Sequence, residues 1–264
     1  MIISTSTIAI ESIYIGSFTP KEEVEAKFII ELKNIDIKEE TIILEFKNNN
    51  FLDENNYIPL ARLYMNLKNQ KININNRVIE IEKNKLLEDA IGYFIPATFK
   101  FTPVDKPGVY KNILYIKNLN NEIIIEKEII FEINRWARYE FSENEYIQII
   151  NNDLKNNKIT SQGGMVLKIA SNSNWQLFGK LNEEGTALMN KLKIYIRQKQ
   201  NENLNLGQPV ILNNIDKLIH RGGPTLNNNN YWTELDLYLE IEDIQNIKSG
   251  AKKFPIIFIL NTVK

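Results

Sequence analysis

The sequence predicts an all-β protein made of two antiparallel β-sandwich domains in tandem, with Greek-key connections and a few short helical turns. Three observations support this fold class. Apolar and polar residues alternate with a period of two along most of the chain, clusters of Asn, Gly, Pro and Asp separate the alternating stretches, and helical periodicity is confined to short segments. At 264 residues the chain is long enough for one large domain or two of ordinary size.

The clearest strand is expected in TELDLYLEIED, where apolar residues face one side and acidic residues with Tyr238 face the solvated side. The same alternation predicts strands in VEAKFIIELK, TIILEFK and KLKIYIR. The residues expected to point inward from these four stretches are Ala26, Phe28, Ile30, Leu32, Ile42, Leu44, Phe46, Leu192, Ile194, Ile196, Leu235, Leu237, Leu239 and Ile241. Short helical turns are expected in NKLLEDA (84–90), ENEYIQII (143–150) and NNIDKLIH (213–220).

A loose similarity between the two halves predicts the domain boundary. ATFKFTPVDKPGVYKNILYI in the first half and LDLYLEIEDIQNIKSGAKKFPIIFIL in the second each give a strand, a Gly-containing loop and a long apolar strand, a pattern typical of a closing hairpin. The junction is placed at NRWARYEF, which gives an N-terminal sandwich at 1–134 and a C-terminal sandwich at 138–264. A single large sandwich or barrel is the alternative.

Charge and composition disfavour several partners. Lysine and arginine total 32 against 33 acidic residues, for a formal net charge of -1, so the chain has little electrostatic attraction for nucleic acid or for an anionic membrane surface. No stretch approaches the roughly 18 to 20 apolar residues that span a bilayer. The absence of cysteine excludes disulfides and thiolate sites but leaves the cellular compartment open.

Catalytic chemistry is not predicted. His220 is the only histidine, and it lies before a Gly-Gly-Pro turn with no accompanying nucleophile or HExxH pattern, so it is interpreted as a surface residue beside a turn. The acidic residues of TELDLYLEIED are interpreted as the solvated face of a strand, and FLDENN (51–56) as a polar loop without calcium-binding spacing. We therefore expect no catalytic residue, no metal site and no cofactor.

The tryptophans differ in their expected roles. Trp175 follows the small polar run SNSN (171–174) and shares the parity of the apolar residues around it, which favours a core position over a ligand platform. Parity places Trp232 and Tyr238 on the outward, acidic face, and these two are the candidate binding residues for a partner. Trp136, at the junction, is assigned a structural role.

The N-terminal segment MIISTSTIAI predicts assembly by strand addition. It has no charged side chain, no Pro and no Gly, and many of its residues are β-branched. The hypothesis is that this segment, through Ile2, Ile3, Ile8 and Ile10, pairs with an open sheet edge of a neighbouring copy. The alternative is that it forms the first strand of its own sandwich.

Two short stretches carry a family resemblance. The strand PGVYKNILYI and the stretch IASNSNWQL, in which a polar run leads into Trp and an apolar strand, resemble the tandem Ig-like β-sandwich modules of bacterial surface proteins and fimbrial subunits. The resemblance implies two Ig-like domains and extracellular display, adhesion or polymerisation without catalysis. It supplies no catalytic residue.

Together these observations predict a non-enzymatic structural or adhesive component of a bacterial surface appendage, such as a pilus or fimbria-like filament subunit or a surface-array protein. A carbohydrate-binding module and a phage or spore structural protein are the alternatives. The expected partner is another copy of the chain, with a glycan or host surface as the alternative. The expected location is extracellular or at the cell surface, with a spore or virion surface as the alternative; the chain begins without a signal-peptide pattern, which cleavage would explain.

Overall fold

The structure is a computed structural model, and it describes residues 10–33, 40–141, 147–149, 158–160, 165–198, 208–225, 231–242, 250–252 and 255–263. Contacts within the chain group it into two compact units, Met1–Asn134 and Arg135–Lys264. That each unit folds independently as a domain stays a prediction. In the described ranges, no helix is both long enough and apolar enough to cross a membrane.

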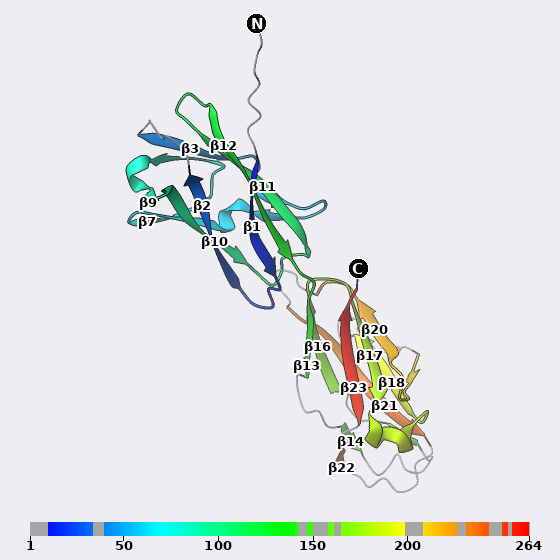
Figure 1. The fold of residues 1–264 in the computed structure, drawn as a ribbon. Helices are drawn as coiled ribbons and strands as arrows, with labels where there is room; N and C mark the ends of the chain where they lie inside the picture. Colours follow the sequence, from blue (N-terminus) through cyan, green and yellow to red (C-terminus); the bar gives the residue numbers. More distant parts are fainter. Residues whose placement is uncertain are drawn as a thin grey trace. The chain divides into compact units, whose positions relative to one another are not determined.

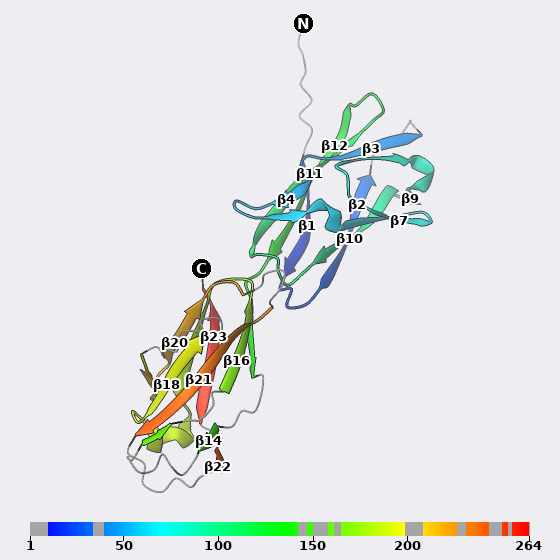
Figure 2. The ribbon, with the colours of Figure 1, turned by 180° about the vertical axis from the view of Figure 1, so that it is seen from behind.

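The first unit contains two sheets, whose strands can be followed in Figures 1 and 2. One sheet has the order β1-β12-β11-β3-β8, with β4 paired to β11 and β5 paired to β4. Its strands are β1 (Glu11–Phe18), β3 (Thr41–Phe46), β4 (Asn50–Leu52), β5 (Tyr57–Pro59), β8 (Val78–Glu82), β11 (Gly108–Lys117) and β12 (Ile123–Ile133). The other sheet has the order β2-β10-β6-β7, with β9 paired to β10. Its strands are β2 (Val24–Lys33), β6 (Leu63–Leu67), β7 (Gln70–Asn73), β9 (Leu87–Asp89) and β10 (Gly92–Phe101).

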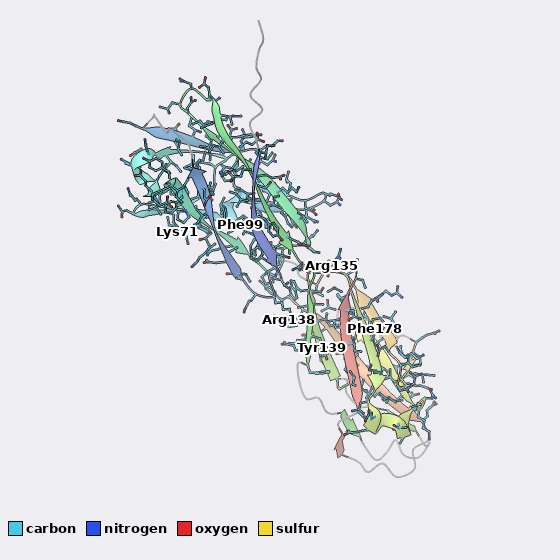
Figure 3. All side chains as sticks on the ribbon, in the orientation of Figure 1. Lys71, Phe99, Arg135, Arg138, Tyr139 and Phe178 are labelled. Atoms are coloured by element: carbon cyan, nitrogen blue, oxygen red, sulfur yellow. The ribbon has the colours of Figure 1, made fainter. Side chains whose placement is uncertain are left out.

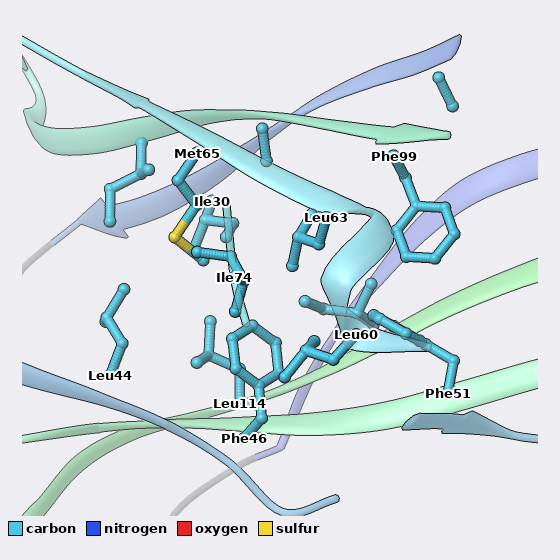
Figure 4. Packing of buried hydrophobic residues seen from close by; sticks show 14 of the residues in the cluster. Ile30, Leu44, Phe46, Phe51, Leu60, Leu63, Met65, Ile74, Phe99 and Leu114 are labelled. Carbon is cyan, nitrogen blue, oxygen red and sulfur yellow. The ribbon is translucent and has the colours of Figure 1, made fainter. Parts of the chain in front are cut away.

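The core of this unit gathers side chains from both sheets, as the all-β prediction requires. Alternate residues of β3 are buried, so the inward residues expected from TIILEFK are confirmed. Within the core, the rings of Phe99, Phe101 and Phe131 pack with centroids 4.9–5.0 Å apart. Figure 4 shows Phe46, Phe51 and other core side chains between the strands.

The pairing of β1 corrects the purely antiparallel prediction. β1 pairs with β12 in parallel, from Glu11 opposite Lys127 to Phe18 opposite Ile133, with an irregularity between Tyr14 and Gly16. Gly16 has a φ of 141°, which a residue with a side chain rarely adopts. Alternation of side chains cannot distinguish the two directions, because both give a period of two.

The second unit also contains two principal sheets. One has the order β13-β16-β21-β18-β19, with β15 paired to β21, and the other has the order β20-β17-β23; β14 and β22 form a separate pair. The strands are β13 (Ala137–Phe141), β14 (Ile147–Ile149), β15 (Lys158–Thr160), β16 (Met165–Ser171), β17 (Trp175–Leu181), β18 (Leu192–Gln198), β19 (Val210–Ile211), β20 (Lys217–Gly222), β21 (Thr233–Glu242), β22 (Gly250–Lys252) and β23 (Ile256–Thr262). The inward leucines and isoleucine of β21 are buried, which confirms the clearest strand prediction.

The short helical turns are mostly elsewhere than predicted. The structure has 3₁₀ turns at Leu60–Arg62, Lys83–Lys85 and Glu183–Leu188. Residues 84–90 contain only part of one turn and then β9, while 217–220 belong to β20. Residues 147–149 form β14, and the rest of 143–150 lies outside the described residues. In these stretches sheet pairing overrides a weak local helical pattern.

The two predicted closing hairpins are wrong, although the strands themselves are present. β10 and β11 belong to different sheets of the first unit, and β21 and β23 belong to different sheets of the second. The connection between β10 and β11, residues 102–107, therefore carries the chain from one sheet to the other. A pattern of strand, loop and strand does not specify which sheet receives the second strand.

Candidate functional site

Trp175 is a core residue, as predicted. It is 1% exposed at the start of β17. The polar run before it is a connection between sheets, because β16 ends at Ser171 and belongs to a different sheet from β17. Ser171 Oγ donates a hydrogen bond to the Trp136 carbonyl oxygen at 2.8 Å, and the Trp136 backbone N–H donates to Asn172 Oδ1 at 2.9 Å. The small polar residues therefore form buried hydrogen bonds that let the chain change sheets beside the core.

His220 does not lie beside a turn at the surface, so that interpretation is wrong. It is half-buried in β20, opposite Leu177 of β17, and its ring centroid lies 5.7 Å from that of Trp175. Burial lowers the pKa of His220 below its ordinary value of 6.5. Among the residues that the structure describes, no group of His, Asp and Glu could hold a metal ion.

Trp232 and Tyr238 are both half-buried, so parity alone overstates their exposure. The guanidinium of Arg138 lies 4.9 Å from the ring centroid of Trp232, and Tyr238 lies opposite Tyr195 of β18. Tyr238 lies in β21 and Trp232 directly precedes that strand, six positions away, which is about 20 Å along an extended chain. The structure therefore gives them no shared surface, and their binding role stays a prediction.

The acidic face of β21 is solvated only in part: the side chain of Glu242 is 46% exposed, but two other acidic residues are buried, which corrects the predicted solvated face. Asp236 and Glu240 are each 6% exposed. Lys193 on the neighbouring strand lies 3.4 Å from Glu240 Oε1 and 2.6 Å from Glu242 Oε1, and these carboxylates raise the lysine's pKa. The hydroxyl of Tyr195 donates to Glu240 Oε2 at 3.1 Å. Because β21 is central in its sheet, long side chains of its neighbours cover its polar face.

The edge strand β23 is the candidate functional site. Its sequence IIFILNT contains no charged residue, and every one of its residues is at least partly exposed, with Ile257 at 42%. In the sheets that the structure describes, all of the remaining terminal strands longer than three residues carry at least one charged side chain. Charges on an edge strand normally discourage pairing with another chain, so β23 lacks a common protection.

The backbone of β23 also faces outward in a regular pattern. In an antiparallel pair, alternate residues bond the neighbouring strand and the others direct both polar groups away from it. The Val263 N–H donates to the Asn174 carbonyl oxygen at 2.9 Å, on the β17 side. The Phe258 carbonyl oxygen instead accepts from the Tyr139 hydroxyl at 3.2 Å. The residues that direct their backbone groups away from β17 are therefore Ile256, Phe258, Leu260 and Thr262.

Two aromatic residues of β13 lie against this edge. Tyr139, labelled in Figure 3, is 38% exposed, and its hydroxyl makes the bond to Phe258. The ring of Phe141 lies 5.9 Å from that of Phe258 in an edge-to-face arrangement. The side chains of Ile256, Phe258 and Leu260 pack against the core of the unit yet remain only partly buried. An added strand would therefore cover apolar surface as well as complete backbone hydrogen bonds.

The predicted assembly residues are only partly described. Ile10 is 56% exposed and directly precedes β1. Ile2, Ile3 and Ile8 lie outside the described residues. The first strand that the structure describes in the first unit is β1, Glu11–Phe18, at one end of its sheet.

No protein-family model and no curated protein sequence matches the chain. Among solved structures, the enterotoxigenic E. coli CFA/I adhesin CfaE aligns over 95% of this chain and 92% of its own, with 9% identity and a TM-score of 0.36. A complex of ICOS, ICOS-L and a VNAR domain aligns over 96% of this chain and 95% of that chain, with 8% identity and a TM-score of 0.35. The N-terminal domain of PorA aligns over 47% of this chain and 87% of that chain, with 12% identity and a TM-score of 0.32. At these values the matches assign neither family nor activity.

Proposed function

We propose that the protein is a non-catalytic structural or adhesive subunit of a surface assembly, and that its copies join by strand addition. Residues 1–10 of one copy would lie along the outward edge of β23 in the next and would replace the hydrogen bond that the Tyr139 hydroxyl makes to Phe258. The observation that carries this proposal is the uncharged, partly exposed edge of β23, with four residues that direct backbone groups away from the sheet.

The two partners of this contact are compatible in length and chemistry. Ten extended residues span about 33 Å and the seven residues of β23 about 23 Å, so the segment is long enough to cover the strand. Neither sequence contains a charged residue, so pairing would bury no unpaired charge. The isoleucines of the segment would add apolar surface over the partly exposed side chains of the edge.

The experiment compares assembly of the full chain with two variants. Deletion of residues 1–10 removes the proposed donor, and Ile257→Lys places a charge on the proposed acceptor edge, where Ile257 is 42% exposed. Ile215→Lys is the matched control, because Ile215 is 63% exposed outside any strand of the same unit. Size-exclusion chromatography and negative-stain electron microscopy are run over a range of concentrations.

The full chain and Ile215→Lys should form concentration-dependent assemblies, while the deletion and Ile257→Lys should remain monomeric with an unchanged unfolding midpoint. Assembly of the deletion variant to the extent of the full chain would contradict the donor role of residues 1–10. A full chain that stays monomeric at every concentration would contradict homopolymerisation. An extracellular or cell-surface location, rather than a spore or virion surface, belongs to the same proposal.

A further inference from the structure

A polar groove in the first unit has none of the predicted site residues in its lining. It has a volume of about 380 Å³ and forms where the β4–β5 hairpin meets the connection between β10 and β11. The residues that matter for its chemistry are Asn55, Asn56, Tyr57, Arg62, Lys106 and Tyr110.

The floor of this groove is held in a fixed arrangement. Arg62 forms an ion pair with Asp105, whose side chain is 3% exposed and also accepts a hydrogen bond from the Thr102 backbone N–H at 2.7 Å. Tyr110 is fully buried, and its hydroxyl donates to the Lys106 carbonyl oxygen at 2.8 Å. A ligand entering the groove would therefore meet groups that are already ordered, which lowers the entropy cost of binding.

The rim offers an aromatic face next to side-chain amides. Tyr57 is 66% exposed, the largest exposed fraction among the exposed large hydrophobic residues of the described chain. Asn55 is exposed beside it, and Asn56 lies 3.5 Å from Asp53 Oδ2. A flat aromatic ring stacks on the C–H face of a sugar. Side-chain amides donate hydrogen bonds to sugar hydroxyls and accept from them, while a guanidinium only donates.

The charges around the groove cancel. Arg62 and Lys106 supply two positive groups, and Asp53 and Asp105 supply two negative ones. Burial raises the pKa of the Tyr110 phenol. The negative charges of Asp53 and Asp105 raise this pKa further, and the positive charge of Arg62 lowers it, so all three charged groups lie near the phenol. A site with balanced charge gives no net attraction to a phosphate, a carboxylate or a basic peptide.

We propose that this groove binds a neutral saccharide, with Tyr57 stacked on one sugar ring and Asn55 and Arg62 hydrogen-bonded to its hydroxyls. The site lies in the first unit, whereas the proposed assembly edge lies in the second. The two proposals therefore fail or succeed separately.

The test is saturation-transfer NMR and titration of the full chain with neutral trisaccharides of glucose, galactose, mannose and N-acetylglucosamine. Sialyllactose and inorganic phosphate are the charged probes. At least one neutral trisaccharide should bind, and Tyr57→Ala should weaken its binding at least tenfold. Asn55→Ala should also weaken it, while Tyr14→Ala, which truncates another exposed tyrosine of the same unit, should leave it unchanged.

The unfolding midpoints of all variants should match that of the unaltered chain, because these side chains are exposed. Absence of binding by every neutral trisaccharide would overturn the proposal. So would a Tyr57→Ala variant that binds as tightly as the unaltered chain, or stronger binding of sialyllactose or phosphate than of any neutral trisaccharide.

Discussion

At the scale of single residues, Lys127 places an ammonium group inside the first unit. Its side chain is 3% exposed, and it pairs with the Glu11 carboxylate, which is 65% exposed on β1. The two residues are opposite each other in the parallel β1–β12 ladder. A shift of β1 by one residue would leave the lysine without this partner, so the ion pair helps to fix the register of an edge strand.

Glu11→Gln should therefore lower the free energy of unfolding by about 1–2 kcal/mol, less than the loss of a fully buried pair because Glu11 is largely exposed. Glu25→Gln is the matched control, since the Lys100–Glu25 pair is 42% and 47% exposed. The control should change stability by less than about 0.5 kcal/mol. Urea unfolding measures the free energy of unfolding of both variants. Equal losses of stability would show that the burial of Lys127 does not strengthen its ion pair.

His220 makes stability depend on pH. Because burial lowers its pKa below 6.5, the unfolded chain binds a proton at a higher pH than the folded chain does. The free energy of unfolding should therefore fall as the pH drops below 6.5 and level off once the folded histidine is also protonated. His220→Gln should show a smaller decrease over this window in urea unfolding at several pH values. An identical decrease would assign the pH dependence to other groups.

At the scale of elements, close packing between β20 and β17 depends on a glycine in β20, Gly222, which lies opposite Trp175. A Cβ at Gly222 would lie 2.4 Å from Cζ2 of Trp175, whereas a Cβ at Gly223 would approach nothing closer than Asn174 Oδ1 at 3.7 Å. The large ring of Trp175 is thus accommodated in the core partly because β20 presents no side chain at that position.

Gly222→Ala should destabilise the second unit by about 1–3 kcal/mol through overpacking against Trp175. Gly223→Ala should be nearly neutral, because the added methyl group meets only an ordinary contact. Thermal unfolding followed by tryptophan fluorescence compares the two variants. A Gly222→Ala variant as stable as Gly223→Ala would mean that the Trp175 ring moves without cost.

Period-two alternation predicts the strands β2, β3, β18 and β21 and their inward faces, because it reflects which side of a strand meets the core. It does not predict strand direction or sheet membership. The sequence therefore led us to expect only antiparallel sheets and a β10–β11 hairpin, and both expectations are wrong. The outward face of β21 was misjudged for a related reason. Whether Asp236 and Glu240 are solvated depends on the long side chains of neighbouring strands, which alternation within one strand cannot show.

At the scale of the whole molecule, the two compact units differ in how completely the apolar residues of their last strands are covered. In the first unit, alternate residues in the second half of β12 are buried down to Ile133. In the second unit, the last strand β23 buries no residue fully. The candidate edge was not singled out from the sequence, although the uncharged run IIFIL was a signal for it.

A fragment of residues 1–134 should fold without the rest of the chain. Its core draws side chains from two sheets, and its aromatic rings pack at 4.9–5.0 Å. Circular dichroism of the purified fragment should show a single cooperative thermal transition. A fragment without such a transition would favour the alternative of one large domain.

The location of the free edge on β23 determines the symmetry that an assembly would have. The proposed donor belongs to the first unit and the proposed acceptor to the second, so each contact joins two different surfaces and is heterologous. Copies joined in this way close into a ring or form an open polar chain, and an open chain has an uncovered β23 at one end and an unengaged donor segment at the other. Growth at the first end requires displacement of the Tyr139 hydroxyl from Phe258, and any molecule that covers β23 would terminate that end.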